Sequence, residues 1–273
     1  MRLELEKTGN SFVTPAISVI VPTFNQGHFL REAIDSVLAQ TFENWELIVV
    51  DNFSSDSTSS LMSTYEDPRI RYYKFRNHGV IGRSRNYGVS LASSPFIAFL
   101  DSDDSWATKK LEICLDCVDD KMVDIVCHAE TWSGPKYPTR LIHYGPMHRC
   151  SFKKLVLLGN CLSTSAIVMR RQRFVDVNGF SEDSRINTAE DYDLWIRLAR
   201  DGARFIFLKE NLGNWRVHTA GTSQSAVKSR VAAYRVFDMY VESVTKNRKF
   251  WRLLYIFKLA GGLVLERLRF LKI

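Results

Sequence analysis

The chain has 273 residues, 45% of them hydrophobic, which suffices for the core of one large domain or of a domain with an appendage. Its five cysteines are an odd number behind no signal-like segment, which argues against a disulfide framework and leads us to expect a reduced, cytoplasmic environment. The net charge of +7 resides in the tail, because residues 246–273 carry eight basic side chains and one acid, which leaves residues 1–245 neutral. A neutral body argues against nucleic-acid binding, and a basic tail favours docking on a surface.

Strands and helices alternate along the first hundred residues. Short runs rich in β-branched and aromatic residues predict four strands, at 17–22, 45–50, 70–75 and 95–100. Apolar residues at helical spacing predict helices between them that end near residues 40, 65 and 91. This rhythm is typical of an α/β fold with a mostly parallel central sheet flanked by helices. The pattern GxGxxG is missing after the first strand, which argues against a dinucleotide-dependent dehydrogenase.

The second half of the chain is less regular. We expect strands at 123–128, 165–169, 204–208 and 213–218. A segment rich in proline, glycine and aromatic residues, 131–147, is typical of a loop that carries specificity. A helix over 190–199 begins with three acids in its first turn.

Three carboxylates follow the apolar run 95–100 within four residues: Asp101, Asp103 and Asp104. A buried strand of a parallel sheet brings such residues to its carboxyl edge, where open α/β sheets bind ligands. Closely spaced carboxylate oxygens suit Mg²⁺ or Mn²⁺, which in turn can bind a diphosphate. The alternative is a solvated acidic turn that caps the next helix.

Separated motifs then follow one another in a fixed order: SVIVPTFN at 18–25, VVD at 49–51, GRSRNYG at 82–88 leading to DSDD at 101–104, EDYDLW at 190–195 and WRVH at 215–218. Together they resemble the inverting nucleotide-sugar glycosyltransferases of family 2, of the bacterial surface-polysaccharide type. The resemblance implies a GT-A-like nucleotide-binding fold over residues 1–245.

The resemblance also implies a donor site at the ends of the first strands. Phe24 would pack on a uracil ring, Thr23 would hydrogen-bond to it, and Asp51 would accept a hydrogen bond from the ring N–H. The alternative for Asp51 is an ordinary turn or cap residue. Either of two arginines would meet the diphosphate, and the choice stays open because one of them can simply pair with an acid. The implied donor-binding residues are Pro22, Thr23, Phe24, Asn25, Asp51, Arg83, Arg85, Asp101 and Ser102.

Asp103 and His218 are the metal ligands that the resemblance implies, for a Mn²⁺ or Mg²⁺ that neutralises charge on the leaving nucleoside diphosphate. The alternative for His218 is an ordinary hydrogen-bonding residue at a strand end. Asp191 resembles the catalytic base, because inversion needs one carboxylate to take the proton of the attacking hydroxyl.

Glu190 and Trp195 are the implied acceptor-binding residues. The acids at 190–193 can also be explained by the helix dipole, which favours negative charge in the first turn. The alternative for Trp195 is packing in the core.

The tail over 246–273 interleaves aromatic and aliphatic residues with Lys and Arg, and its longest uncharged stretch, 259–265, is too short to span a membrane. This composition predicts a basic amphipathic helix that lies in the interface of an anionic membrane. The alternative is a helix that folds back on the domain with a solvated basic face.

These inferences predict a metal-dependent hexosyltransferase that uses UDP-hexose or UDP-N-acetylhexosamine. The expected acceptor is a glycan carried on polyprenyl diphosphate, in O-antigen (lipopolysaccharide), capsule or exopolysaccharide synthesis at the cytoplasmic face of the inner membrane. Two alternatives remain. A sugar nucleotidyltransferase shares the layout but needs a glycine-rich basic loop, which 23–27 lacks. A non-catalytic carbohydrate or membrane-binding module has no need of Asp103, Asp191 and His218 together.

Overall fold

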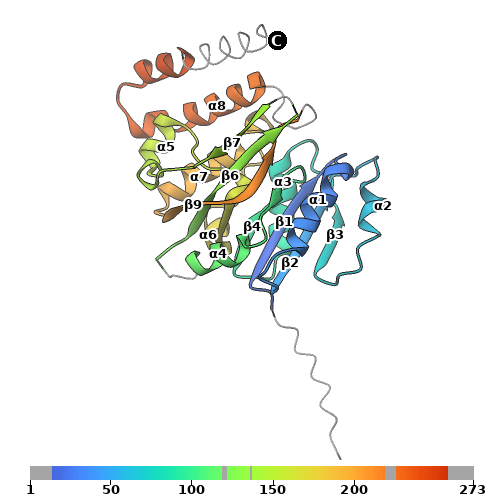
Figure 1. The fold of residues 1–273 in the computed structure, drawn as a ribbon. Coiled ribbons are helices and arrows are strands. Elements are labelled where there is room, and N and C mark those ends of the chain that lie inside the picture. Colours follow the sequence, from blue (N-terminus) through green and yellow to red (C-terminus); the bar gives the residue numbers. More distant parts are fainter. Residues whose placement is uncertain (1–13, 119–121, 136, 219–225, 258–273) are drawn as a thin grey trace, which may run out of the picture.

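One nine-stranded sheet runs through the computed structural model, which describes residues 14–118, 122–135, 137–218 and 226–257 (Figure 1). Its order is β3-β2-β1-β4-β8-β6-β9-β5, with β7 added beside β6. The strands are β1 (Ile17–Thr23), β2 (Trp45–Asp51), β3 (Ile70–Lys74), β4 (Phe96–Phe99), β5 (Ser105–Trp106), β6 (Ile125–Gly134), β7 (Tyr137–Ile142), β8 (Ile167–Arg170) and β9 (Phe205–Arg216). The expected α/β class is confirmed.

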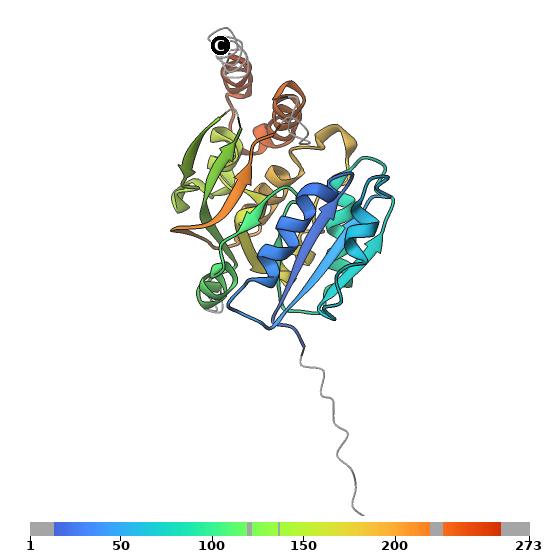
Figure 2. The same ribbon diagram turned by 45° about the vertical axis from the view of Figure 1, so that its right-hand side comes forward.

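The N-terminal half of the sheet, β3-β2-β1-β4, is entirely parallel. Consecutive residues of a strand point to opposite faces, so Val19 and Val21 pack in one core cluster and Ile20 in the other. The first cluster also holds the apolar side of α1 (Gly27–Leu38), whereas α3 (Ile81–Leu91) covers the opposite face (Figure 2). Gly88 permits this close packing, because a Cβ there would lie 2.5 Å from the Ile20 side chain.

The C-terminal half of the sheet is mixed. β8 runs antiparallel to both β4 and β6, β6 and β9 are parallel, and β5 is antiparallel to β9. Parallel pairing is therefore concentrated in the first half. The two strands expected at 204–208 and 213–218 are one long strand, β9, whose register against β6 shifts between Cys127 and Glu130. The expected loop 131–147 contains β7, which pairs with β6 as a hairpin.

The remaining helices are α2 (Thr58–Met62), α4 (Lys110–Val118), α5 (Phe152–Leu158), α6 (Arg171–Asp176), α7 (Glu190–Arg200) and α8 (Ala226–Val244). A further helical segment, 248–257, lies beside α8 at the end of the described chain (Figure 1). Its Tyr255 ring stacks on Phe237 of α8 with ring centroids 4.5 Å apart. Within the described ranges no helix combines the length and apolarity that a membrane crossing needs. The rest of the expected tail, 258–273, lies outside the described residues.

Candidate active site

The ends of β1 and β2 form the first part of the site. Thr23 and Asp51 are register partners at the carboxyl edge, and both are buried. The Asp51 carboxylate accepts hydrogen bonds from the Ser54 backbone N–H at 2.9 Å and from the Tyr72 hydroxyl at 2.6 Å. Phe24, one residue beyond β1, leaves 55% of its surface exposed. A carboxyl group that accepts hydrogen bonds and an open aromatic face therefore lie at the same edge of the sheet.

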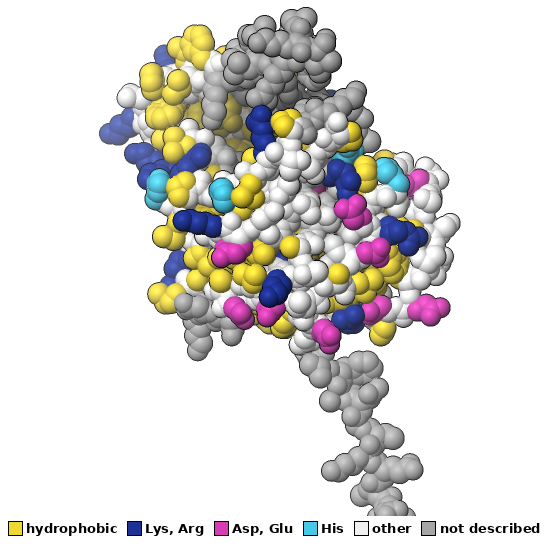
Figure 3. All heavy atoms as spheres, viewed as in Figure 1, with side chains coloured by type: hydrophobic (Ala, Val, Ile, Leu, Met, Phe, Trp, Pro, Cys, Tyr) yellow, Lys and Arg dark blue, Asp and Glu magenta, His cyan; other side chains and the backbone are white. Residues whose placement is uncertain are grey.

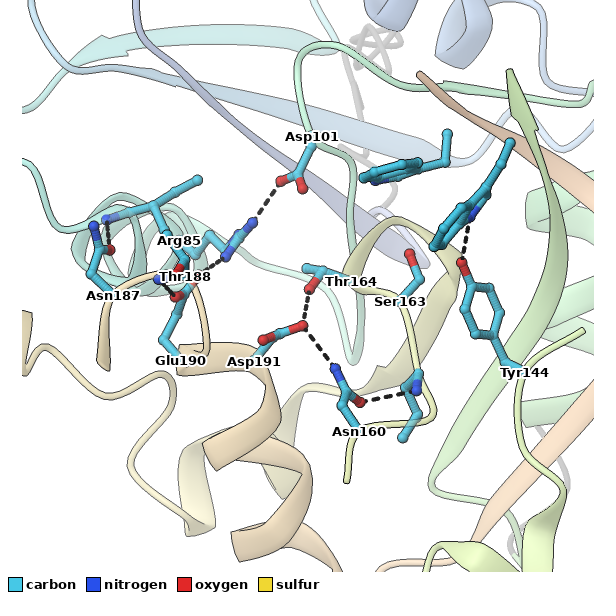
Figure 4. Close-up of a pocket in the computed structure, with 14 residues that line it drawn as sticks. Arg85, Asp101, Tyr144, Asn160, Ser163, Thr164, Asn187, Thr188, Glu190 and Asp191 are labelled. Atoms are coloured by element: carbon cyan, nitrogen blue, oxygen red, sulfur yellow. Dashed lines mark hydrogen bonds and ion pairs between the residues drawn. The ribbon is translucent and has the colours of Figure 1, made fainter. Parts of the chain in front are cut away.

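Arg85 of α3 joins the two halves of the molecule. The residue is 3% exposed, and its guanidinium donates to Asp101 Oδ1 at 2.6 Å and to Glu190 Oε1 at 2.7 Å (Figure 4). Arg83 instead pairs with Glu182 at 3.3 Å and does not line the cavity described below. Of the two candidate arginines, only Arg85 lies beside the acids that follow β4.

The acidic turn after β4 is tied to the end of β9. Asp103 Oδ2 lies 2.9 Å from His218 Nε2, although the two residues are far apart in the chain. The neighbouring Ser102 hydroxyl donates to Gln26, which precedes α1. Asp104 is buried and accepts hydrogen bonds from the Ser165 hydroxyl and the Arg216 backbone N–H. The third acid of the cluster is therefore structural, and Asp103 is the one that meets the histidine.

Asp103 and His218 fit part of a divalent metal shell, because a carboxylate oxygen and an imidazole nitrogen, both ligands that divalent metals accept, lie 2.9 Å apart. Among the described residues, no group of three His, Cys, Asp or Glu side chains has the arrangement of a metal site. Mg²⁺ sites in proteins commonly keep several water ligands beside one or two side chains.

The start of α7 supplies the opposite wall. Asp191 Oδ2 accepts hydrogen bonds from Asn160 and from Thr164, each at 3.4 Å. Burial, together with the neighbouring negative charge of Glu190, raises the pKa of Asp191 to about 7. Such a carboxylate can both hold and release a proton near neutral pH. Glu190 Oε2 accepts from the Thr188 backbone N–H at 2.7 Å, so both of its oxygens have protein partners.

A cavity of about 290 Å³ lies between these walls. Of the sequence-predicted site residues, it brings together Arg85, Asp101, Glu190 and Asp191. Aromatic and amide residues to which no role was assigned from sequence also line the cavity: Trp132, Tyr144, Asn160, Asn187 and Trp215. For Trp132 and Tyr144, the only signal in the sequence was that 131–147 is rich in proline, glycine and aromatic residues.

Trp195 corrects one expectation. Its side chain is 0% exposed and packs in the core cluster that α5, α7 and α8 share. On an amphipathic helix this position faces inward, away from the cavity. The assignment of Trp195 to acceptor binding was wrong, and the alternative of core packing is confirmed.

Comparison with known proteins identifies the class. The model of the family "Glycosyl transferase family 2" matches residues 18–172, more than half of the chain. A glycosyltransferase of Rickettsia typhi is 29% identical over 242 residues, which cover 86% of this chain and 74% of that protein. The Escherichia coli protein WfgD, named UDP-Glc:alpha-D-GlcNAc-diphosphoundecaprenol beta-1,3-glucosyltransferase, is 42% identical over 97 residues, which cover 36% of this chain and 38% of WfgD.

Solved structures share the fold. S. aureus TarS in complex with UDP-GlcNAc is 18% identical with a TM-score of 0.63, covering 89% of this chain and 80% of TarS. The mannosyltransferase PcManGT of Pyrobaculum calidifontis, in complex with GDP-Man and Mn²⁺, is 16% identical with a TM-score of 0.66, covering 93% of this chain and 76% of PcManGT. The chain belongs to glycosyl transferase family 2 and has the GT-A-like fold of these neighbours.

Proposed function

We propose that this glycosyltransferase moves a hexose from a UDP-sugar to a hydroxyl of a glycan, with inversion at the anomeric carbon. One observation carries the proposal. Asp191, whose pKa is raised to about 7, lines the same cavity as Asp101 and Arg85 at the carboxyl edge of β4. A base and a site for a charged leaving group thus lie in one chamber, as a direct displacement requires.

The donor proposal rests on the edge formed by β1 and β2. Asp51 would accept the uracil N–H, Thr23 would hydrogen-bond to the ring, and Phe24 would pack on it. The Thr23 hydroxyl is buried without a protein partner among the described residues, and a base would give it one. UDP-GlcNAc in TarS and UDP-Glc in the name of WfgD support a UDP-sugar as donor. Asp101 would bind the ribose, and Arg85 the diphosphate.

The cofactor that we propose is Mn²⁺ or Mg²⁺ held by Asp103 and His218. When bound, the metal would neutralise the charge that develops on the leaving diphosphate. The Mn²⁺ in the PcManGT complex supports this proposal. The chain's own contribution is to hold the Asp103 oxygen within 2.9 Å of the His218 nitrogen and to keep Arg85 beside Asp101.

Asp191 would take the proton of the acceptor hydroxyl while that oxygen attacks opposite the leaving group. Asn160 and Thr164 hydrogen-bond to the Asp191 carboxylate and hold it toward the cavity (Figure 4). Glu190 would support the acceptor side through its ion pair with Arg85. Family membership and this base weigh against a sugar nucleotidyltransferase and against a non-catalytic binding module.

The donor and metal assignments are tested by thermal shift with UDP-, GDP- and dTDP-sugars, each with Mn²⁺ or with EDTA. A ligand that binds only the folded chain raises the melting temperature. We expect a rise with a UDP-sugar that EDTA abolishes. If the folded protein responds to none of the donors, the proposed donor site is contradicted. If the response survives EDTA, the proposed requirement for a metal is contradicted.

We further propose that the segment 246–273, whose described part packs on α8 through Tyr255, docks on the cytoplasmic face of the inner membrane, where a polyprenyl-diphosphate-linked acceptor would lie. In the described part of this segment, five apolar side chains are 46–66% exposed: Phe250, Leu253, Leu254, Ile256 and Phe257. Figure 3 shows hydrophobic side chains gathered over this end of the molecule, with Lys and Arg nearby. An exposed apolar face flanked by cations suits an anionic bilayer surface.

Sedimentation with vesicles tests this docking in the full chain. We expect binding to vesicles containing phosphatidylglycerol, weaker binding to pure phosphatidylcholine, and loss of binding in Phe250→Glu/Phe257→Glu. Val175→Glu, on the exposed side of α6, is the matched control. Vesicle binding that survives the double substitution would rule out this face as the docking surface.

A further inference from the structure

Two tryptophans stand side by side on one face of the sheet. Trp132 of β6 and Trp215 of β9 are register partners in neighbouring parallel strands, so their side chains leave the sheet on the same side. Their ring centroids are 4.4 Å apart, with the ring planes inclined at 37°. Both residues are half-buried and line the cavity that Asp191 also lines.

A buried polar chain fixes the orientation of this pair. The Trp132 indole N–H donates to the Tyr144 hydroxyl at 3.1 Å, and that hydroxyl donates to Glu130 Oε2 at 2.6 Å. Glu130 is completely buried beneath the aromatic residues. The hydrogen-bonding capacity of the Trp132 nitrogen is thereby used within the protein, which leaves the ring surfaces as the groups that can meet a ligand.

The opposite side of the cavity is polar. Figure 4 shows Tyr144 on one side and Asp191, Thr164 and Asn160 across from it. A hexopyranose has matching chemistry, with an apolar C–H face for aromatic rings and hydroxyls for amide, hydroxyl and carboxylate groups. Trp132, Trp215 and Tyr144 form an aromatic wall and carry no positive charge that could bind a diphosphate. Arg85 lies on the other side of the cavity, beside Asp101.

We propose that Trp132, Trp215 and Tyr144 form the subsite for the terminal pyranose of the acceptor. The aromatic wall stacks on the C–H face of that sugar and presents one of its hydroxyls to Asp191. This inference rests on the proposed function, because it assumes that the donor base occupies the edge near Asp51. It adds the part of the acceptor that is recognised, a sugar ring rather than the lipid or its phosphates.

Titration of UDP-loaded protein with alkyl glycosides of glucose, galactose, mannose and N-acetylglucosamine tests the subsite. Intrinsic tryptophan fluorescence is the readout, because a sugar stacked on the two indoles must change their emission. We expect one glycoside to produce a saturable change. Trp132→Leu and Trp215→Leu are each expected to weaken its binding roughly ten-fold. The Kd of each leucine variant for UDP, measured separately by calorimetry, is expected to stay within about two-fold of the wild-type Kd, which is roughly the precision of that measurement.

Tyr144→Phe keeps the ring and removes only the hydroxyl that orients Trp132, so it serves if a leucine variant does not fold. We expect it to weaken glycoside binding about five-fold. Leu141→Ala, at an exposed position of β7, is the matched control and should bind like wild type.

The outcomes separate the two proposals. Wild-type protein that binds no UDP would overturn the proposed function. Protein that binds UDP but no glycoside, or whose variants keep wild-type glycoside binding, would overturn the subsite alone. Equal weakening of UDP-sugar and glycoside binding in the variants would also overturn it, because the rings would then hold the donor sugar.

Discussion

The two halves of the molecule build their parts of the site in different ways. In the parallel half, the expected donor residues sit directly at strand ends, so Thr23 and Asp51 meet because β1 and β2 are neighbours in register. In the mixed half, Trp132, Asn160 and Asp191 come from a strand, a connecting segment and a helix, and no strand pairing brings all three together. The difference teaches that strand pairing positions the residues expected to bind the donor, whereas tertiary packing positions the residues proposed for the acceptor.

Replacement of the proposed base should have the largest effect, because it should reduce glycosyl transfer and leave UDP binding unchanged. In Asp191→Asn we expect glycosyl transfer to fall by about 10²–10⁴-fold, the usual contribution of a general base. UDP binding should be unchanged, because Asp51 and Thr23 lie in the other half. Transfer is measured as UDP release that depends on acceptor, and binding by calorimetry. Asp201→Asn, just beyond the other end of α7, is the control, and transfer by Asp191→Asn at the wild-type rate would refute the assignment.

Arg85 is the joint between the halves, so its loss should destabilise the fold itself. In Arg85→Met we expect a loss of about 3–5 kcal/mol in the free energy of unfolding, because two carboxylates lose the buried cation between them. Urea denaturation measures it. Arg83→Met, two residues earlier on α3, should stay within about 0.5 kcal/mol of wild type, since its pair with Glu182 is exposed. Equal effects would mean that Arg85 does not join the halves.

Asp51→Asn should weaken UDP binding, because Asp51 lies at the edge of β1 and β2 where we expect the uracil ring. We expect UDP affinity to fall by about 1.5–3 kcal/mol, the range for a hydrogen bond to a charged group. Tyr72→Phe, which removes one protein partner of Asp51 and keeps its charge, should weaken UDP binding less. Calorimetry with UDP and with uridine locates the loss at the base. Unaltered UDP binding in Asp51→Asn would contradict the proposal that Asp51 binds the uracil ring.

Asp191 should also produce a stability difference that depends on pH. The folded-state pKa of Asp191, about 7, lies above the ordinary aspartate pKa of about 3.9 in the unfolded chain. The protonated form is thus favoured by folding, and its stabilisation fades as the pH rises from about 4 through about 7. The melting temperature of Asp191→Asn relative to wild type should therefore increase across that window and level off above it. A constant difference would indicate an ordinary pKa.

Periodicity predicted the parallel half well, because each strand there is a short apolar run between turn residues. It missed β7, since Pro138 marks a loop in an isolated reading. The structure tolerates this proline because β7 pairs with β6 on one side and no other described strand borders it. Periodicity also divided β9 into two strands, at 204–208 and 213–218. Between these two runs the structure has a register shift against β6 instead of a turn.

The site divides in the same way. Local motifs were enough to predict roles for Asp101 and Asp191, whereas the pairing of Arg85 with Asp101 and Glu190 joins residues that no local pattern connects. The Trp132–Trp215 pair was missed for the same reason, because it exists only through the register of β6 and β9. Trp195 shows the opposite error, since proximity to a motif says nothing about the direction in which a side chain points.

The position of β9 bears on how the protein is made. This strand lies between β6 and β5 in the sheet, yet it is the last strand of the described chain. During synthesis, β1 to β4 can pair as soon as they leave the ribosome, whereas β5 and one edge of β6 must wait for residues 205–216. The same late strand brings Trp215 and leads to His218. The nascent chain can therefore complete the parallel half of the sheet before the cavity that Trp215 lines exists. Until β9 is made, one edge of β6 is exposed, and this is the surface that a chaperone would meet.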